Sequence, residues 1–188
     1  VVLRDGPIRT ISDLKGKKIG FSVGGFEEAL LSGMLQKYNL KMSDVDLVNI
    51  NFSLSPSLIA KKVDAVIGAF RNFELNQMDI VNHPGRAFYP EEHGVPTYEE
   101  LIYIANQKNK NNPLFDKFFS AIQKATLTII NDPVSTWKDF SSFRKGLDDE
   151  LNKRAYKDTI SRFSLRPQAH DIKTYKNFSN FLKRKGII

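Results

Sequence analysis

The residues best suited to bind a ligand are two adjacent glycines, Gly24 and Gly25, which Phe26 and Glu27 follow. A short apolar stretch at residues 18–23 precedes them, and an amphipathic pattern follows them. Glycines let the backbone approach a ligand closely, and the start of a helix presents unpaired N–H groups and the positive end of its dipole. The pattern therefore predicts a binding loop, although a tight turn between strand and helix explains two glycines equally well.

A second group of polar residues, Asn72 and Glu74, follows a near-continuous apolar segment at residues 63–69. Such a segment is typical of a parallel strand that is buried on both faces. Open α/β sheets bind their ligands beyond the carboxyl ends of the strands. Because a carboxylate accepts hydrogen bonds side by side, Glu74 is a candidate ligand-binding residue, with a solvated helix residue paired to a lysine as the alternative.

The composition excludes several kinds of chemistry. There is no cysteine, which excludes disulfides, thiolate zinc sites and thiol catalysis. The histidines, His83, His93 and His170, have no metal-ligand spacing, so we predict neither a metal nor a cofactor. The formal charge of +7 is scattered apart from one dense cluster at residues 183–185, which does not favour nucleic acid as a partner.

The chain has 188 residues, enough for one or two domains with a substantial core. No apolar run approaches the roughly 20 residues of a membrane span, and we expect a soluble chain. It begins at Val1 without a methionine or a signal peptide, which we interpret as a trimmed or processed fragment.

Alternating strand and helix patterns predict an α/β architecture for residues 1–106. We expect strands at residues 18–23, 46–50, 63–69, 86–89 and 101–105, and helices at residues 27–38, 56–62 and 72–80. After the polar connector at residues 107–112, helical periodicity dominates residues 107–188. There we expect helices from about Phe115 to Ile129 and at residues 134–143, 148–163 and 171–185.

Several segments together resemble one known family. They are DLKGKKIG (13–20), GGFE (24–27), VDAVIG (63–68), RNFE (71–74), EHGVP (92–96) and NDP (131–133) with Trp137. The chain resembles the thiamine-pyrimidine precursor binding proteins, which are substrate-binding components of bacterial ABC importers and are similar to the fungal pyrimidine synthase of thiamine biosynthesis. The resemblance implies a type II periplasmic-binding-protein-like lobe, with a parallel-rich sheet flanked by helices, followed by a C-terminal helical portion.

The same resemblance implies hydroxymethylpyrimidine or its formylamino derivative as the ligand and a membrane ABC permease as the partner. It implies a periplasmic or membrane-anchored extracytoplasmic location. It covers this chain throughout but only the latter part of a typical family member, so we expect an incomplete first lobe. Two alternatives stay open: an incomplete clamshell, or self-association that covers the exposed face.

The resemblance also implies which residues bind the ligand. The candidates are Gly24, Gly25, Phe26, Glu27, Arg71, Asn72, Glu74, Glu92 and His93. Either Glu74 or Glu92 reads the pyrimidine amine and a ring nitrogen, and Asn72 supports it. We expect Arg71 to bridge the lobes and not to bind the ligand. We expect His93 to make a hydrogen bond within its loop and not to contact the ligand directly. Phe26 is expected equally to form an apolar wall of the site or to pack in the core.

The leading functional hypothesis is a non-enzymatic solute receptor whose two lobes close on the ligand. The alternatives are a binder of another small solute such as a sulfonate, and a thiamine biosynthesis enzyme like the pyrimidine synthase. The synthase family has a cysteine-rich iron-site segment, so the lack of cysteine disfavours the enzyme. The effector half of a transcription regulator would require an upstream helix-turn-helix, which these residues do not contain.

Overall fold

A computed structural model describes all residues from 1 to 188 and divides them into two compact units. The first unit comprises Val1–Thr97 and Ile172–Ile188, and the second comprises Tyr98–Asp171. The predicted boundary at residue 106 therefore differs from the division into units, and the last helix groups with the α/β part of the chain.

A five-stranded mixed sheet forms the centre of the first unit, in the order β3-β2-β4-β1-β5. The strands are β1 (Val2–Leu3), β2 (Lys18–Phe21), β3 (Asp46–Asn49), β4 (Ala65–Val66) and β5 (Gly85–Arg86). β2 pairs in parallel with β3 and β4, whereas β1 is antiparallel to both β4 and β5. The strands β2, β3, β4 and β5 thus end at one side of the sheet, here named the carboxyl edge, and start at the amino edge.

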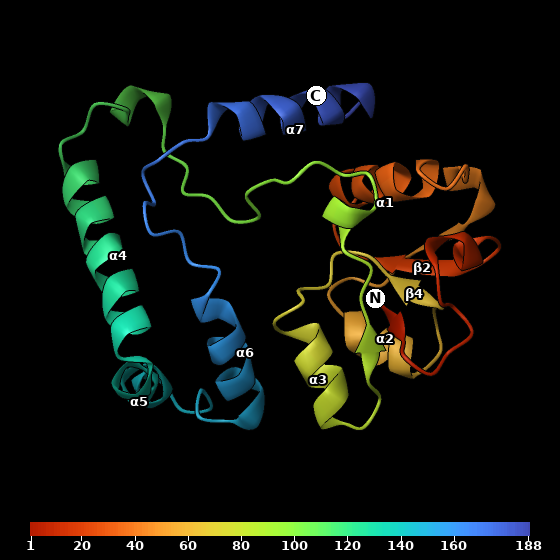
Figure 1. Cartoon of the computed structure of the whole chain (residues 1–188), viewed down its shortest axis with the longest axis horizontal. Coiled ribbons are helices and arrows are strands. Elements are labelled where there is room, and N and C mark those ends of the chain that lie inside the picture. The colour runs from red at the N-terminus through yellow and green to blue at the C-terminus, as the bar shows by residue number, and fades with distance from the viewer. The chain divides into compact units, whose positions relative to one another are not determined.

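Three helices cover the two faces of this sheet: α1 (Phe26–Gln36), α2 (Leu54–Ile59) and α3 (Glu74–Ile80). Figure 1 shows α1 on one face and α2 and α3 on the other. This arrangement follows from right-handed crossovers, because the chain moves from β2 outward to β3 and then back past β2 to β4. Between these two helices and the sheet lies a core of Leu54, Leu58, Val63, Val66 and Met78.

Short 3-10 helices complete the connections: η1 (Ile11–Leu14), η2 (Met42–Asp44), η3 (Pro90–Glu92) and η4 (Gln107–Asn109). Thr10 caps η1 together with Asp13, whose Oδ2 accepts the Thr10 N–H at 2.8 Å. Backbone hydrogen bonds from Arg9 and Thr10 lower the pKa of Asp13. Thr10 is therefore the N-cap of this turn.

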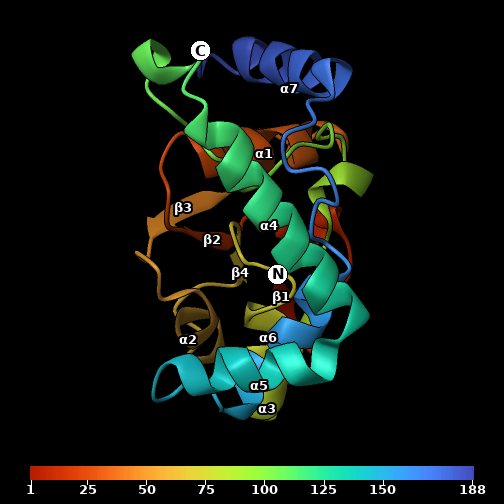
Figure 2. The same cartoon turned by 90° about the vertical axis from the view of Figure 1, so that its left-hand side faces the viewer.

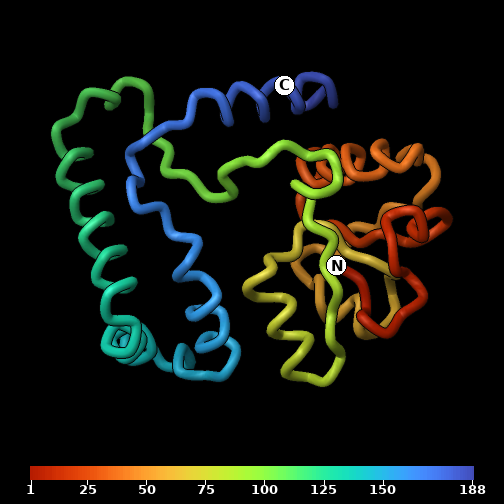
Figure 3. Tube along the Cα trace, viewed as in Figure 1, coloured from red at the N-terminus to blue at the C-terminus, as the bar shows by residue number.

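The last helix, α7 (Ile172–Arg184), lies along α1, as the tube in Figure 3 shows. The Phe181 ring is buried over Gly33, and a Cβ on Gly33 would lie 2.9 Å from that ring. The ammonium of Lys185 donates to Ser32 Oγ at 3.0 Å. Contact between α1 and α7 therefore requires a residue without a side chain at position 33.

The second unit is helical: α4 (Leu114–Asn131), α5 (Pro133–Phe143) and α6 (Glu150–Ile160). Asp132 ends α4 and caps α5 by accepting the Ser135 N–H at 3.1 Å, and α5 then runs steeply across the end of α4 (Figure 2). The rings of Trp137 and Tyr156, 5.3 Å apart, join α5 to α6. None of the helices in either unit is long and apolar enough to cross a membrane.

The predicted strand at residues 101–105 is wrong. These residues belong to no sheet, and Leu101 and Ile104 are 84% and 88% exposed. Tyr103 contacts α4, with its ring 5.0 Å from that of Phe118. Because a strand needs a neighbouring strand and the second unit supplies none, the apolar run stays extended and unpaired.

Candidate functional site

Most of the predicted binding residues lie on loops that leave the carboxyl edge of the sheet. The loop after β2 carries Gly24 and Gly25, and the loop after β4 carries Arg71 and Asn72 and leads into Glu74. The chain that follows β5 carries Glu92 and His93. Since β2 and β4 are neighbours, the first two loops lie side by side.

The loop after β2 is open to solvent at its glycines. Gly25 caps α1 with a φ of 80°, and its N–H donates to the Glu28 carboxylate at 3.0 Å. A Cβ placed on Gly25 would meet no atom within 4 Å. A ligand can therefore approach this backbone without displacing a side chain.

The buried carboxylate of Glu27 joins the loops that follow β2 and β4. Glu27 is 5% exposed, and it accepts hydrogen bonds from the N–H and the Oγ of Ser22, each at 2.8 Å. It also lies against Gly68, where an added Cβ would overlap Oε1 and come within 2.9 Å of Oε2. The Glu27 carboxylate is thus occupied by protein groups on both sides, which makes it a strut between the two loops.

Glu74 sits in a hydrogen-bonded turn at the start of α3. Its Oε2 accepts the Phe70 N–H at 2.7 Å, while its own N–H donates to the Phe70 carbonyl at 3.0 Å. The side chain is half-buried, and this burial raises the pKa of Glu74 above its ordinary 4.5, with the Phe70 hydrogen bond acting in the opposite direction. A partly desolvated carboxylate with a raised pKa beside an open loop is typical of a side chain that binds a ligand.

Arg71 and Asn72 make contacts within the first unit. The Arg71 guanidinium binds both oxygens of Glu91, at 2.9 and 3.1 Å, and lies 4.0 Å above the Tyr89 ring. This contact bridges the loops after β4 and β5. The Asn72 carbonyl accepts a hydrogen bond from the Asn76 amide at 3.0 Å.

Glu92 and His93 lie beside the carboxyl end of α1, away from the glycines. Lys37 donates to the Glu92 carbonyl at 2.5 Å, and the Tyr38 hydroxyl pairs with Nδ1 of His93 at 2.8 Å. With 11 residues, α1 is about 16 Å long, so its two ends are separate sites. His93 makes the loop hydrogen bond favoured from the sequence, and the structure does not bring Glu92 near Gly25.

Phe26 packs against α7. Its half-buried ring lies edge-on to Phe178 of α7, with centroids 6.1 Å apart. Between the two roles open for Phe26, this contact supports a core position.

Sequence analysis missed four exposed apolar residues at the carboxyl edge. They are Val23, Phe52, Phe70 and Phe73, with exposures of 45%, 82%, 43% and 37%. The available signal was a bulky apolar residue within a few positions of each predicted strand end, where a polar turn residue is the norm.

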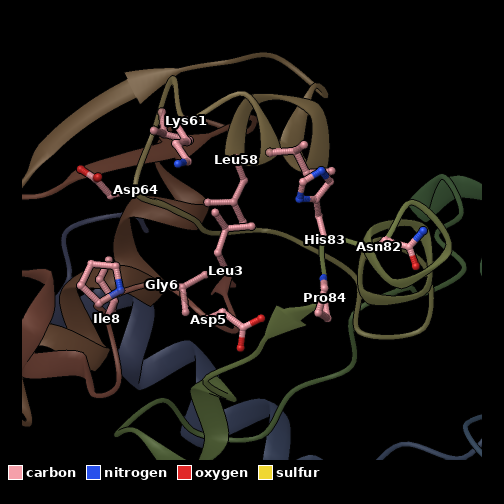
Figure 4. A pocket seen from close by; sticks show the side chains of 14 residues that line it. Leu3, Asp5, Gly6, Ile8, Leu58, Lys61, Asp64, Asn82, His83 and Pro84 are labelled. Atoms are coloured by element: carbon pink, nitrogen blue, oxygen red, sulfur yellow. The ribbon is translucent and has the colours of Figure 1, made fainter.

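A cavity lies elsewhere, at the amino edge of the sheet. It holds about 540 Å³, and Figure 4 shows Leu58 at its wall and Asp5, Lys61 and His83 around it. It contains none of the predicted binding residues. The predicted binding residues therefore lie on the loops and not at this cavity. No three His, Asp or Glu side chains gather anywhere in the chain as a metal site would require.

Comparison with known proteins places this geometry in context. The family described as NMT1/THI5 like matches residues 1–136. A Haemophilus influenzae protein named for thiamine biosynthesis is 44% identical over 100% of this chain and 60% of its own length. The 4-amino-5-hydroxymethyl-2-methylpyrimidine phosphate synthase of Schizosaccharomyces pombe is 27% identical over 100% of this chain and 57% of its own length.

A formylaminopyrimidine-binding protein of Halalkalibacterium halodurans is also similar, with 27% identity over 65% of this chain and 38% of its own length. Among solved structures, the alkanesulfonate-binding protein SsuA of Xanthomonas axonopodis pv. citri, bound to MOPS, superposes with a TM-score of 0.69. The match covers 99% of this chain and 63% of that structure at 17% identity. The fold is that of type II periplasmic binding proteins, and the chain spans between 38% and 63% of the length of these proteins.

Proposed function

This chain belongs to the NMT1/THI5-like family, and we propose that it is part of a solute-binding protein that captures a 4-aminopyrimidine precursor of thiamine. The observation that carries the proposal is the pairing of an open glycine loop with the half-buried carboxylate of Glu74 at one edge of the sheet. The relative from Halalkalibacterium halodurans, named for binding a formylaminopyrimidine, supports the ligand class.

Glu74 has the chemistry to read a 4-aminopyrimidine. The exocyclic amine of such a ligand is a donor, and a ring nitrogen becomes a second donor when it is protonated. Phe70 occupies Oε2 of Glu74, so Oε1 accepts from the ligand amine in our proposal. We prefer Glu74 to Glu92 as the carboxylate that binds the ligand amine, because Glu92 ends η3 beside the far end of α1.

The remaining predicted residues take supporting roles in this proposal. Gly24 and Gly25 bring the backbone to the polar substituent of the ring, and Asn72 supports Glu74. Glu27 acts indirectly by holding the glycine loop against Gly68, since its own carboxylate is buried. Arg71, bound to Glu91, holds neighbouring loops together.

We further propose that the protein delivers its ligand to an ABC permease outside the cytoplasm. A binding protein closes on its ligand because some contacts form only in the closed state, and the permease then distinguishes the two states. We also propose that the chain self-associates through exposed apolar segments of the second unit, such as residues 101–105.

A sulfonate ligand is the first alternative, suggested by the likeness to the alkanesulfonate-binding protein. A sulfonate needs cationic or N–H donors. In the first unit the guanidinium of Arg71 is engaged by Glu91, and the Glu74 carboxylate would repel an anion at the glycine loop. These charges favour an amine-bearing ligand.

A pyrimidine synthase is the second alternative, supported by the likeness to the Schizosaccharomyces pombe enzyme. The synthase resemblance implies cysteine ligands for iron, and this chain has no cysteine. Binding without turnover is therefore the activity we propose.

Calorimetry tests the proposal directly. We expect 4-amino-5-hydroxymethyl-2-methylpyrimidine to bind this chain with a higher affinity than an aliphatic sulfonate of similar size. Glu74→Gln is expected to remove most of that preference, while Glu91→Gln, which lies outside the proposed ligand contacts, retains it. Equal affinity for both ligands, or release of a modified pyrimidine, would overturn the proposal.

A further inference from the structure

Two loops at the carboxyl edge expose phenylalanines on either side of the glycine loop. Phe52 follows β3 and is 82% exposed, and Phe70 follows β4 and is 43% exposed. Strand β2 lies between β3 and β4, so the loop with Gly24 and Gly25 lies between the two rings in sheet order. Bulky apolar side chains exposed together at a sheet edge mark a binding surface.

Local hydrogen bonds hold the Phe52 loop in its conformation. Asn51 has a left-handed φ of 51°, and its N–H donates to the Asn49 side chain at 2.9 Å. The Ser53 N–H donates to the Ile50 carbonyl at 3.1 Å. Phe52 therefore projects from a defined turn, with most of its ring exposed to solvent.

Phe70 is fixed to the proposed reading group. Its N–H donates to the Glu74 carboxylate at 2.7 Å, and its carbonyl accepts the Phe73 N–H at 3.1 Å. The Phe70 ring and the Glu74 carboxylate therefore belong to one hydrogen-bonded turn. If Glu74 binds the exocyclic amine of an aminopyrimidine, the pyrimidine ring lies beside the turn that carries Phe70.

The spacing of the sheet suits a flat ring between the two phenylalanines. Two strand separations span about 10 Å, while a ring with an aromatic contact on each face needs about 7 to 8 Å. The space above the centre is open, because an added Cβ on Gly25 would meet nothing within 4 Å. The ring site therefore requires the Phe52 and Phe70 side chains to incline toward each other.

We propose that Phe52 and Phe70 bind the two faces of the ligand's heteroaromatic ring above the Gly24–Gly25 loop. This inference rests on the proposed function and adds the residues that select an aromatic ring over an aliphatic chain. Aromatic rings attract a flat heterocycle by dispersion and by complementary charge distribution, which an alkyl sulfonate cannot match. Glu74 selects the amine, and the phenylalanines select the ring.

The test compares matched phenylalanine variants by calorimetry with 4-amino-5-hydroxymethyl-2-methylpyrimidine. Phe52→Ala and Phe70→Ala are each expected to weaken binding about tenfold, the usual effect of losing one stacking ring. Phe143 and Phe163 are 80% and 40% exposed in the second unit, so Phe143→Ala and Phe163→Ala are the controls for Phe52 and Phe70. Both controls are expected to retain wild-type affinity.

Ligand proton spectra provide a readout that a folding defect would not reproduce. Stacking between two rings moves the ligand methyl resonance upfield in the complex, and Phe52→Ala is expected to reduce that shift. Phe52→Trp is expected to restore both the shift and the affinity.

The outcomes separate the two proposals. If the pyrimidine binds and both phenylalanine variants match wild type, the ring site is wrong and the proposed function stands. If pyrimidines with and without the 4-amino group bind equally and both variants weaken them, the ring site stands and the aminopyrimidine assignment fails. If no heteroaromatic ring binds, or if the phenylalanine variants instead change only the oligomeric state, the ring site is overturned.

Discussion

Glu27 and Gly68 are in contact across the carboxyl edge of the sheet, one in the first turn of α1 and the other just after β4. The glycine has a φ of +85°, and an added Cβ would overlap the Glu27 carboxylate. Position 68 thus requires glycine for two reasons: its backbone is left-handed, and the Glu27 carboxylate occupies the space that a Cβ would need. The contact fixes the glycine loop relative to the turn that carries Glu74.

Gly68→Ala is predicted to destabilise the first unit more than a left-handed conformation alone explains. The conformational cost is about 1 to 2 kcal/mol, and displacing a buried carboxylate adds roughly 1 to 3 kcal/mol. Urea denaturation followed by circular dichroism measures the total. Gly16→Ala is the matched control, because Gly16 has a φ of +72° with nothing within 4 Å of an added Cβ. Equal losses for both variants would show that the strut contact contributes nothing.

Glu27→Ala is predicted to lower the free energy of unfolding by roughly 2 to 4 kcal/mol, because it leaves the Ser22 N–H without its buried acceptor. Ser22→Ala removes one hydrogen bond and is expected to cost about 1 kcal/mol. Combining the two changes in a double-mutant cycle measures their coupling. Additive losses would mean that the two residues act independently.

Glu74→Gln is predicted to increase stability at neutral pH while weakening ligand binding. The folded state raises the pKa of Glu74 above its ordinary 4.5, so its ionised form opposes folding and its protonated form does not. The stability gain of the variant should therefore be present above the raised pKa and disappear as the pH falls through it toward 4.5. Thermal melts of both proteins across this pH range provide the measurement, and a gain that grows on acidification would contradict it.

Ionisation of Glu74 should also control ligand affinity. Whereas it lowers the stability of the fold, it should strengthen ligand binding. Only the ionised carboxylate has full capacity to accept from the ligand amine, so wild-type affinity should fall as the pH drops through the raised pKa of Glu74. The Glu74→Gln variant should lack this component of the pH profile. Calorimetry at several pH values distinguishes the two profiles.

Arg71→Gln is predicted to leave the binding of a neutral pyrimidine unchanged within about twofold. The ion pair with Glu91 is partly exposed, with side-chain exposures of 31% and 36%, so its loss should cost about 1 kcal/mol or less. High salt should shrink that difference. Loss of ligand binding in this variant would instead make Arg71 a ligand contact.

Self-association of this chain is predicted to depend on residues 101–105. Replacing Leu101 and Ile104 by lysine adds charge to an unpaired apolar segment, which should shift sedimentation toward the monomer. Val81→Lys changes an apolar residue of 48% exposure in the first unit and serves as the control. An unchanged distribution for the double variant would exclude this segment as the contact.

Much of the first unit follows from local sequence signals. The helix predicted at residues 27–38 is observed at Phe26–Gln36, and the strand at residues 46–50 at Asp46–Asn49. The strand expected at residues 63–69 is only Ala65–Val66, because Gly68 turns the chain with a left-handed φ. The apolar composition of residues 63–69 indicates that the segment is buried, but it does not indicate how many of these residues form strand hydrogen bonds.

The features that the sequence did not reveal share a physical cause, which is dependence on partners distant in the sequence. Leu101 to Ala105 have strand composition, but pairing depends on a neighbour that local sequence cannot supply. Glu27 was expected beside the ligand, yet its carboxylate is buried against Ser22 and Gly68, two contacts that only the folded loops create. Likewise, nothing near Glu92 in the sequence indicates that it lies beside Lys37.

Val95 and Phe181 both rest on Gly33, where an added Cβ would lie 3.2 Å from the first and 2.9 Å from the second. The segments before and after residues 98–171 therefore both pack on one position of α1. Residues 98–171 are, in effect, an insertion between two parts of one module. Exchanging that insertion for a glycine-serine tether long enough to reach from Thr97 to Ile172 would yield a minimal scaffold, in which the glycine loop and its phenylalanines could be studied or transplanted free of the rest.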